Sequence, residues 1–332
     1  MGEARIWHGG DLDEAQKLFP SAPGPWIDLS TGINPIPYPM PVLPSSSFER
    51  LPPPAAHGDL EEAAAKAYGA ADAAGVVAAP GTQVLISLLP HLRSRSRVAV
   101  LGPTYAEHAQ AWRQAGHAVA EIASLGDTEQ ADVVVVVNPN NPDGRLLERG
   151  TLLNLAQTLG RRAGLLVVDE AFADFDADET LVPFLPENAI VLRSFGKTYG
   201  LAGLRLGFAI APAGIAVPLQ AALGPWAVSG PAIEAGRRAL RDSDWIAAAK
   251  RARAADSRRL DALLATVADA LPRGTILYRL MESRRAPDLF VHLGGSGIWV
   301  RRFAFNPHLL RFGLPGSEEA WSRLEAALGS FA

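Results

Sequence analysis

Residues 194–207 read Ser-Phe-Gly-Lys-Thr-Tyr-Gly-Leu-Ala-Gly-Leu-Arg-Leu-Gly, directly after the apolar run Ile190–Leu192. Lys197, inside this stretch, is one of four lysines in a chain of 332 residues. The other three lie in polar or alanine-rich contexts typical of surface helices, whereas Lys197 lies among glycine, serine and apolar residues. An amine in such surroundings needs a partner. It is either a structural lysine beneath a loop or the amine that forms an imine with a carbonyl cofactor, which an arginine cannot do.

The apolar runs on both sides of this stretch indicate an α/β fold. Short runs rich in valine, leucine and isoleucine alternate with helical patterns, and their near-continuous hydrophobicity is typical of strands buried on both faces. We therefore expect a mostly parallel sheet sandwiched by helices. The predicted strands cover residues 76–79, 97–101, 118–122, 133–137, 165–168, 190–193 and 206–211.

The pattern of the chain predicts three parts. Residues 1–56 are rich in proline and glycine and are predicted to form an extended arm. Residues 57–212 form the large α/β domain, and residues 213–332 form a smaller C-terminal α+β domain. In this last part we expect helices over residues 231–240, 245–271 and 318–328, and strands over residues 275–280, 289–293, 298–305 and 309–312.

Composition excludes several classes of protein. A hydrophobic content of 48% and a charged content of 20% are typical of a globular protein. The net charge of −4 provides no basic surface, so we expect neither a nucleic acid nor a membrane as partner. The absence of cysteine excludes disulfides, thiolate chemistry and cysteine-ligated metal, and we expect no metal. With no signal-peptide pattern and no apolar segment of membrane-spanning length, we expect a cytoplasmic protein.

Two polar residues follow neighbouring apolar runs at the point where each predicted strand ends. Asp169 follows the run 165–168, and a carboxylate at the carboxyl end of a buried parallel strand points into the crevice where α/β sheets bind ligands. The ordinary alternative is a helix cap or a turn residue. Lys197 follows the strand 190–193 and should emerge at the same edge. The sequence therefore predicts a carboxylate and an amine in one crevice.

Two turns add candidates to this crevice. Gly81-Thr82-Gln83 is predicted to begin a helix, where free backbone N–H groups and a hydroxyl suit a phosphate, although many such turns bind nothing. Ser194 and Arg205 could add a hydroxyl and a cation to the same anion. The sequence Asn-Pro-Asn-Asn-Pro at 138–142 forms a turn by default, but it also follows a buried strand.

The order of these motifs resembles that of the fold-type I pyridoxal-phosphate enzymes, the aspartate aminotransferase superfamily. The resemblance spans nearly the whole chain and implies a seven-stranded-type sheet, pyridoxal 5'-phosphate bound by residues 57–212, and a homodimer with sites at its interface. The motifs are Gly-Thr-Gln at 81–83, Tyr105, Asn-Pro-Asn-Asn-Pro at 138–142, Asp-Glu-Ala at 169–171, Ser-x-x-Lys at 194–197 and Gly-Leu-Arg-Leu-Gly at 203–207.

The resemblance also implies a role for each matching residue. Lys197 would bond covalently to the cofactor, and Asp169 would keep the ring nitrogen protonated so that the ring accepts electrons. Arg311 would clamp a substrate carboxylate with its bidentate fork. The other implied cofactor contacts are Asn141 with the ring 3-oxygen, Tyr105 stacked on the ring, and Gly81, Thr82, Gln83, Ser194 and Arg205 around the phosphate.

Two positions depart from the commonest family pattern. Phe172 stands where many relatives have a tyrosine that donates to the 3-oxygen, so the electronics of the cofactor would differ. Leu51-Pro52-Pro53 stands where many relatives have Tyr-Pro-Asp, whose tyrosine reaches the phosphate of the partner subunit. A phosphate contact from a partner subunit is therefore not implied for this chain.

The arm contains His-Gly-Gly at 8–10 and Asp-Leu-Ser-Thr-Gly-Ile-Asn-Pro at 28–35. These two motifs resemble those of the threonine-phosphate decarboxylases of cobalamin biosynthesis, relatives of the histidinol-phosphate aminotransferases. The resemblance implies decarboxylation of O-phospho-L-threonine to (R)-1-aminopropan-2-yl phosphate and carbon dioxide. The alternative is an aminotransferase acting on a phosphorylated amino compound such as histidinol phosphate. The arm residues expected to contact the substrate, unless they only begin an irregular arm, are His8, Gly9, Gly10, Thr31, Gly32 and Asn34.

Overall fold

The computed structural model describes residues 8–40 and 42–331, which divide into two compact units. Unit 1 contains the described residues up to Ile36, the segment Pro142–Gly144, and the residues from Ala248 onward. Unit 2 contains the described residues of Pro37–Asn141 and Arg145–Ala247. These limits differ from the predicted domain limits at residues 56 and 212. Residues 1–7 and 41 of the predicted arm lie outside the described residues.

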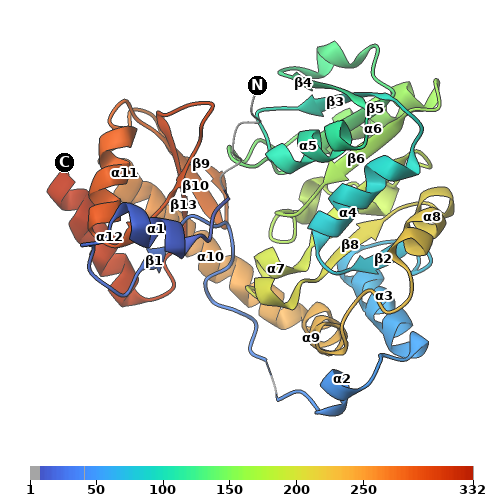
Figure 1. Cartoon of the computed structure of the whole chain (residues 1–332), viewed down its shortest axis with the longest axis horizontal. Helices are drawn as coiled ribbons and strands as arrows, with labels where there is room; N and C mark the ends of the chain where they lie inside the picture. The colour runs from blue at the N-terminus through green and yellow to red at the C-terminus, as the bar shows by residue number, and fades with distance from the viewer. Residues whose placement is uncertain (1–7, 41, 332) are drawn as a thin grey trace. The chain divides into compact units, whose positions relative to one another are not determined.

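Unit 2 is built on a seven-stranded sheet in which every strand except β8 runs in the same direction (Figure 1). The predicted α/β fold class is therefore confirmed. The strand order is β2-β8-β7-β6-β5-β3-β4. The strands are β2 (Val76–Ala79), β3 (Arg97–Leu101), β4 (Ala118–Ile122), β5 (Val133–Val137), β6 (Leu165–Asp169), β7 (Ala189–Ser194) and β8 (Gly207–Ile210).

Helices cover both faces of this sheet, which explains the near-continuous apolar runs. In β5 all five valines are at most 2% exposed, because alternate side chains enter two different cores. One core includes residues of α3 (Pro54–Tyr68), α6 (Arg149–Gly160) and α9 (Gly230–Leu240). The other core includes residues of α4 (Thr82–Leu88), α5 (Ala106–Gln114) and α8 (Ala213–Leu223).

The strand directions bring distant segments of the chain to one edge of the sheet. The parallel strands β2, β3, β5, β6 and β7 all end there, and the antiparallel strand β8 begins there. Gly207, the first residue of β8, pairs with Ala79 at the end of β2 and with Ser194 at the end of β7. Five strand ends and one strand start therefore meet at the carboxyl edge, where open α/β sheets bind their ligands.

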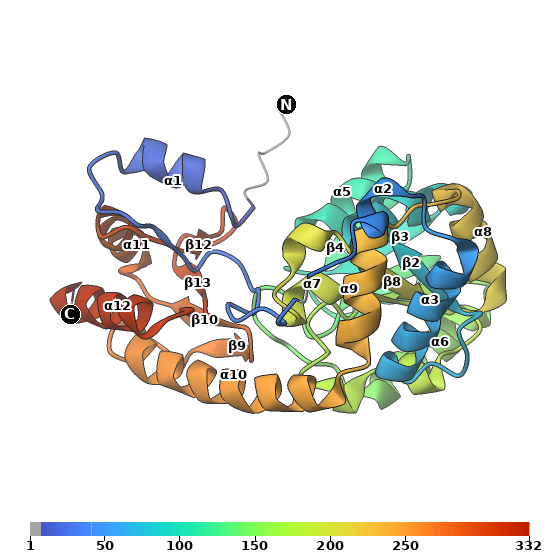
Figure 2. The same ribbon diagram turned by 90° about the horizontal axis from the view of Figure 1, so that it is seen from below.

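Unit 1 is an α+β unit around a four-stranded antiparallel sheet of order β12-β13-β10-β9, with helices packed against it (Figure 2). A separate parallel pair joins β1 to β11. The elements are α1 (Leu12–Leu18), β1 (Ile27–Asp28), α10 (Ser243–Leu264, in this unit from Ala248), β9 (Arg273–Thr275), β10 (Tyr278–Glu282), α11 (Ala286–Gly295), β11 (Ile298–Trp299), β12 (Arg301–Arg302), β13 (Leu309–Gly313) and α12 (Glu318–Phe331).

Several expectations about local structure were wrong. Residues 289–293, expected as a strand, belong to helix α11, whose buried residues Leu289, Phe290 and Leu293 follow the helical period. The arm, expected to be extended, contains the helices α1 and α2 (Ser46–Glu49). Helix α8 was not among the expected helices, and it contains Pro218, a residue type that is unfavourable inside a helix.

Within the described part of the chain, no helix is both long enough and apolar enough to cross a membrane.

Candidate functional site

Asp169 is the last residue of β6 and lies at the carboxyl edge of the sheet, where it is only 4% exposed. Its Oδ2 atom lies 2.8 Å from Nε2 of His108, and its Oδ1 atom accepts a hydrogen bond from the backbone N–H of Ala171 at 3.0 Å. His108 lies on α5 and is 1% exposed. A buried carboxyl group without partners would be costly, so these two contacts both satisfy Asp169 and fix its direction.

Lys197 lies in α7 (Phe195–Thr198), a single turn that directly follows β7. Its Nζ atom lies 5.7 Å from the centroid of the Phe172 ring, within the range of a cation–π contact. Phe172 follows Asp169 by three residues, and Asp169 pairs in the sheet with Leu192, five residues before Lys197. The carboxylate and the amine therefore come from the ends of neighbouring strands, as predicted.

A tight junction forms where β2 ends and β8 begins. Gly81 has a φ of +89°, and a Cβ built on it would lie 2.7 Å from Nη2 of Arg205. A Cβ built on Gly207 would lie 2.5 Å from the backbone nitrogen of Thr82. Since Gly207 also pairs with Ser194, the structure brings together four of the predicted phosphate contacts. Their hydroxyls, backbone N–H groups and guanidinium suit a phosphate group.

Tyr105 and Gln83 lie beside the His108–Asp169 pair. The Tyr105 hydroxyl donates to Oε1 of Gln83 at 3.1 Å, and the Tyr105 ring meets the His108 ring edge-on with centroids 6.2 Å apart. Asn141 is half-buried in the turn after β5, the strand next to β6. Unit 2 thus gathers a carboxyl group, an amine, an aromatic ring and phosphate donors at one sheet edge. Such a set can hold a flat, protonated nitrogen heterocycle that carries a phosphate.

The arm residues of unit 1 converge on Arg311. The backbone N–H of Gly10 donates to the Ser30 hydroxyl oxygen at 2.7 Å, and that hydroxyl donates to Oδ1 of Asp28 at 2.5 Å. Nη2 of Arg311 donates to the carbonyl oxygen of Ser30 at 2.8 Å. Gly9 packs so closely that an added Cβ would lie 2.3 Å from the same carbonyl oxygen. Ser30 therefore joins Gly9 and Gly10 to the predicted carboxylate clamp.

Arg311 lies in β13, is 6% exposed, and stands directly opposite Arg301 of β12. Burial lowers the pKa of Arg311, against the opposing influence of Tyr278 and Asp28. Two like charges on opposite positions of neighbouring strands repel each other, and the repulsion is relieved when an anion binds to both. The pair is therefore suited to bind an anionic group.

The remaining predicted substrate residues occupy different surroundings within unit 1. His8 is exposed, Thr31 is half-buried and Gly32 is buried. Asn34 is 2% exposed, and its Oδ1 atom accepts from the Ile36 N–H at 3.1 Å and from Nη1 of Arg253 at 3.3 Å. Asn34 is thus held by the long helix α10.

Two residues in these clusters were missed from the sequence. His108 lies three residues after Tyr105, a spacing that places both side chains on one helix face. That spacing could have identified it. Arg301 could not have been found in this way, because only the pairing of β12 with β13 places it opposite Arg311.

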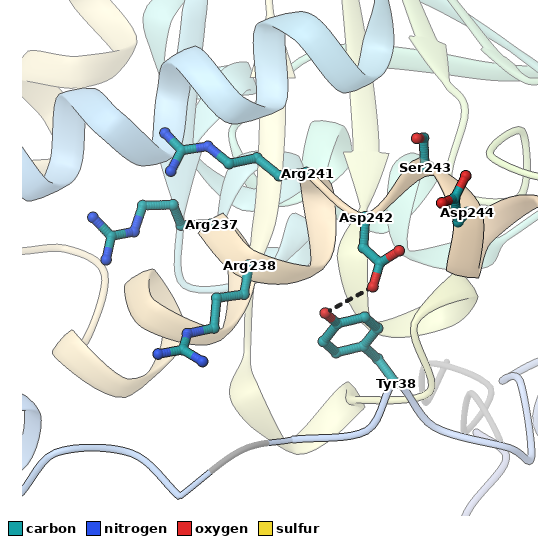
Figure 3. Close-up of a pocket in the computed structure, with 7 residues that line it drawn as sticks. All are labelled: Tyr38, Arg237, Arg238, Arg241, Asp242, Ser243 and Asp244. Carbon is teal, nitrogen blue, oxygen red and sulfur yellow. Dashed lines mark hydrogen bonds between the residues drawn. The ribbon is translucent and has the colours of Figure 1, made fainter.

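A surface cavity of about 630 Å³ in unit 2 involves none of the predicted site residues (Figure 3). Arg237 contacts Asp59, outside the lining, at 3.1 Å, and Asp242 accepts a hydrogen bond from the Tyr38 hydroxyl at 3.2 Å. Arginines at the C-terminal end of α9 also interact favourably with the helix dipole. The cavity is lined by Tyr38, Arg237, Arg238, Arg241, Asp242, Ser243 and Asp244.

Comparisons with known proteins agree with this geometry. Residues 36–327 match the family model "Aminotransferase class I and II". A threonine-phosphate decarboxylase of Pseudomonas aeruginosa is 43% identical over 98% of this chain and 97% of its own length. A histidinol-phosphate aminotransferase of Paracoccus denitrificans is 32% identical over 76% of this chain and 70% of its own length.

Among solved structures, the L-threonine-O-3-phosphate decarboxylase of Porphyromonas gingivalis superimposes with a TM-score of 0.74 at 23% identity, covering 98% of this chain and 97% of that one. This likeness supports the fold. The match to the family model and the identity to the bacterial relatives establish more: the chain belongs to the aminotransferase class I and II family.

Proposed function

We propose that this protein binds pyridoxal 5'-phosphate and decarboxylates O-phospho-L-threonine, giving (R)-1-aminopropan-2-yl phosphate and carbon dioxide for cobalamin biosynthesis. The structural observation that carries the proposal is the position of Asp169. This residue is buried, its carboxyl group has two hydrogen-bond partners, and it lies at the sheet edge from which Lys197 also emerges. The choice of substrate is supported by the near full-length similarity to a threonine-phosphate decarboxylase, compared with a shorter and lower similarity to a histidinol-phosphate aminotransferase.

The residues of unit 2 fit this cofactor in chemistry and in space. Gly81 and Gly207 have no side chain, which allows Arg205 to lie close to Gly81 and Thr82 to lie close to Gly207. We call this junction the phosphate cradle, because its donors suit a phosphate. Asp169 would accept the hydrogen of a protonated ring nitrogen, while His108 keeps that carboxyl group in place. When bound, the cofactor would supply an electron sink for the bond broken at the substrate Cα.

Lys197 has two tasks in this proposal. Its amine would hold the cofactor covalently before the substrate arrives, and it would then return a proton to Cα after carbon dioxide has left. The first task requires an amine, so arginine cannot replace it. The second requires Nζ to lie within hydrogen-bond reach of Cα, which makes the position of α7 important for the rate.

The substrate carries two anionic groups, a carboxylate and a phosphate, and unit 1 offers a cationic pair. We propose that Arg301 and Arg311 bind these groups, together with donors of the arm such as Gly10 and His8. Only the bond perpendicular to the cofactor ring loses its electrons to the ring. In the proposed reaction, the orientation of the bound substrate would therefore decide whether the carboxylate or the Cα hydrogen leaves, which separates a decarboxylase from an aminotransferase.

The test is incubation of the purified protein with pyridoxal phosphate and O-phospho-L-threonine. We expect release of carbon dioxide and formation of aminopropanol phosphate, and no release from Lys197→Ala, whose fold is checked by circular dichroism. A parallel reaction supplies histidinol phosphate with 2-oxoglutarate. Glutamate formation there, without carbon dioxide release from phosphothreonine, would establish the aminotransferase alternative instead.

We further propose a homodimer, which the family resemblance implies, and a cytoplasmic location, which the sequence features favour. Light scattering on the purified protein would test the dimer, and a monomer that retains full activity would refute it.

A further inference from the structure

A buried ionic cluster (Glu170, Asp174 and Arg193) lies beside the candidate site. Arg193 is 1% exposed, and its Nη1 atom contacts Oδ1 of Asp174 at 3.1 Å while its Nε atom lies 3.5 Å from Oε2 of Glu170. Its guanidinium also lies over the Tyr68 ring, 4.8 Å from the centroid. Glu170 accepts further hydrogen bonds from the Thr180 hydroxyl at 2.5 Å and from a backbone N–H.

The cluster lies on the opposite face of the sheet from the Asp169 side chain. Asp169 reaches His108 on α5, whereas Arg193 reaches Tyr68 on α3, and these two helices cover different faces. This arrangement follows from the alternation of side chains along a strand, because Arg193 follows Leu192, the sheet partner of Asp169. The ionic cluster therefore contacts the segments that carry Asp169 and Lys197 from the opposite face of the sheet, and it does not enter the candidate site.

The cluster joins the two segments on which the site depends. Asp174 belongs to the loop that follows Asp169 and carries Phe172, while Arg193 immediately precedes the segment that carries Lys197. Burial raises the pKa of Asp174, and both Arg193 and the Thr198 hydroxyl on α7 act to lower it. Asp174 thus contacts Arg193 at the end of β7, and its carboxyl group also responds to the Thr198 hydroxyl in α7, the turn that carries Lys197.

A contribution to the stability of the fold does not by itself explain why these charged residues are buried together. Burial raises the pKa of both Glu170 and Asp174, and Arg193 only opposes that shift. Replacing a buried ion pair by apolar side chains of similar size is often neutral or stabilising, because desolvation offsets the attraction between the charges. Directional contacts between charged groups do, however, restrict how two segments can lie against each other.

We propose that Arg193 and Asp174 are positioning residues that fix the Lys197 turn relative to the Asp169 loop. Neither residue is proposed to touch the cofactor or the substrate. The inference rests on the proposed function only in taking Lys197 as the residue that holds the cofactor. A misplacement of about 1 Å can cost about a hundredfold in rate, so a loosened turn should slow the reaction of the Lys197 amine.

Two matched substitutions test the positioning role. Thr198→Val removes the α7 hydroxyl that acts on Asp174, and Thr180→Val removes the hydroxyl that donates a hydrogen bond to Glu170 at the far end of the cluster. Both threonines are buried, and both substitutions keep the size of the side chain. A difference in cofactor fixation between the two variants that is not mirrored in their stability is therefore specific to the turn that carries Lys197.

Apoprotein is mixed with pyridoxal phosphate, and samples are reduced with borohydride at increasing times to fix the cofactor that has bonded to Lys197. Mass spectrometry with peptide mapping then gives the rate at which the fixed cofactor accumulates at Lys197. Thermal unfolding of the same apoproteins measures stability. We expect Thr198→Val to fix the cofactor about tenfold more slowly than wild type. Thr180→Val should react at the wild-type rate. Equal rates in all three proteins, or equal slowing in both variants, would overturn the positioning role.

Asp174→Asn provides a second variant that retains the shape of the side chain. It should slow cofactor fixation at least as much as Thr198→Val, because it removes the charge that pairs with Arg193 and that the Thr198 hydroxyl acts on. A wild-type rate in Asp174→Asn would overturn the inference even if the threonine variants fail to fold. Failure of wild-type protein itself to gain cofactor mass at Lys197 would instead refute the proposed function, and the inference with it.

Discussion

Gly207→Ala should weaken cofactor binding although the new methyl group lies on a strand and carries no charge. The added Cβ would lie 2.5 Å from the Thr82 backbone nitrogen, about 0.9 Å inside the 3.4 Å at which ordinary contact begins. It would also lie 3.0 Å from the Gly81 carbonyl carbon. Backbone atoms cannot rotate away, so either β8 or the Gly81–Thr82 turn has to move by most of this distance.

Two free energies follow from that displacement. Overpacking should cost the fold about 1–3 kcal/mol. Loss of one hydrogen bond from the displaced turn to a charged phosphate should cost about 1.5–3 kcal/mol of binding. Since 1.4 kcal/mol corresponds to a factor of ten, the dissociation constant for pyridoxal phosphate should rise about 10- to 100-fold.

Equilibrium dialysis of apoprotein against pyridoxal phosphate measures the dissociation constant, and urea unfolding measures stability. Gly203→Ala is the matched control, because it lies four residues earlier and an added Cβ would meet no heavy atom within 4 Å. It should bind the cofactor like wild type. A Gly207→Ala protein with unchanged affinity would refute the assignment of this junction as the phosphate cradle.

Three further substitutions test other parts of the molecule. His108→Phe leaves Asp169 without one buried partner, which costs about 1–3 kcal/mol, so dialysis should show faster loss of the cofactor; undiminished retention would contradict this. Arg301→Met should raise the KM for phosphothreonine about tenfold or more while cofactor affinity is kept, and unchanged steady-state kinetics would remove Arg301 from the substrate site. Arg193→Met should raise the pKa of the two carboxyl groups of the ionic cluster further, so that the folded state binds protons more tightly than the unfolded state and stability falls as pH rises. Urea unfolding should therefore find this variant closer to wild-type stability near about pH 5 than at neutrality, and a pH-independent difference would contradict the assigned charges.

The strands and the sheet edge could be predicted from sequence because burial on both faces requires an uninterrupted run of apolar residues. The five valines of β5 and the run before Asp169 are such signals. Once these strands are assumed parallel, their carboxyl ends must meet, so the convergence of Asp169 and Lys197 follows from topology. Which side chains touch at that edge does not follow, because it depends on helix placement.

Other features depend on contacts that no local pattern encodes. The short apolar run in α11 fits a strand or a buried helix equally well until its packing partners are known. Arg301 and Arg311 are brought together by strand register, and Arg193 reaches Asp174 across a loop. Buried charges of this kind are also unexpected from composition, since isolated charged residues are usually assigned to the surface.

The residues proposed to bind the cofactor and those proposed to bind the substrate belong to different units. All the residues assigned to cofactor chemistry belong to unit 2, and all those assigned to substrate recognition belong to unit 1. Under the proposed function, substitutions in the cationic β12–β13 pair or the arm would change substrate binding without replacing any residue that holds the cofactor. A change of substrate, or even of the bond that is broken, would then require substitutions in unit 1 alone.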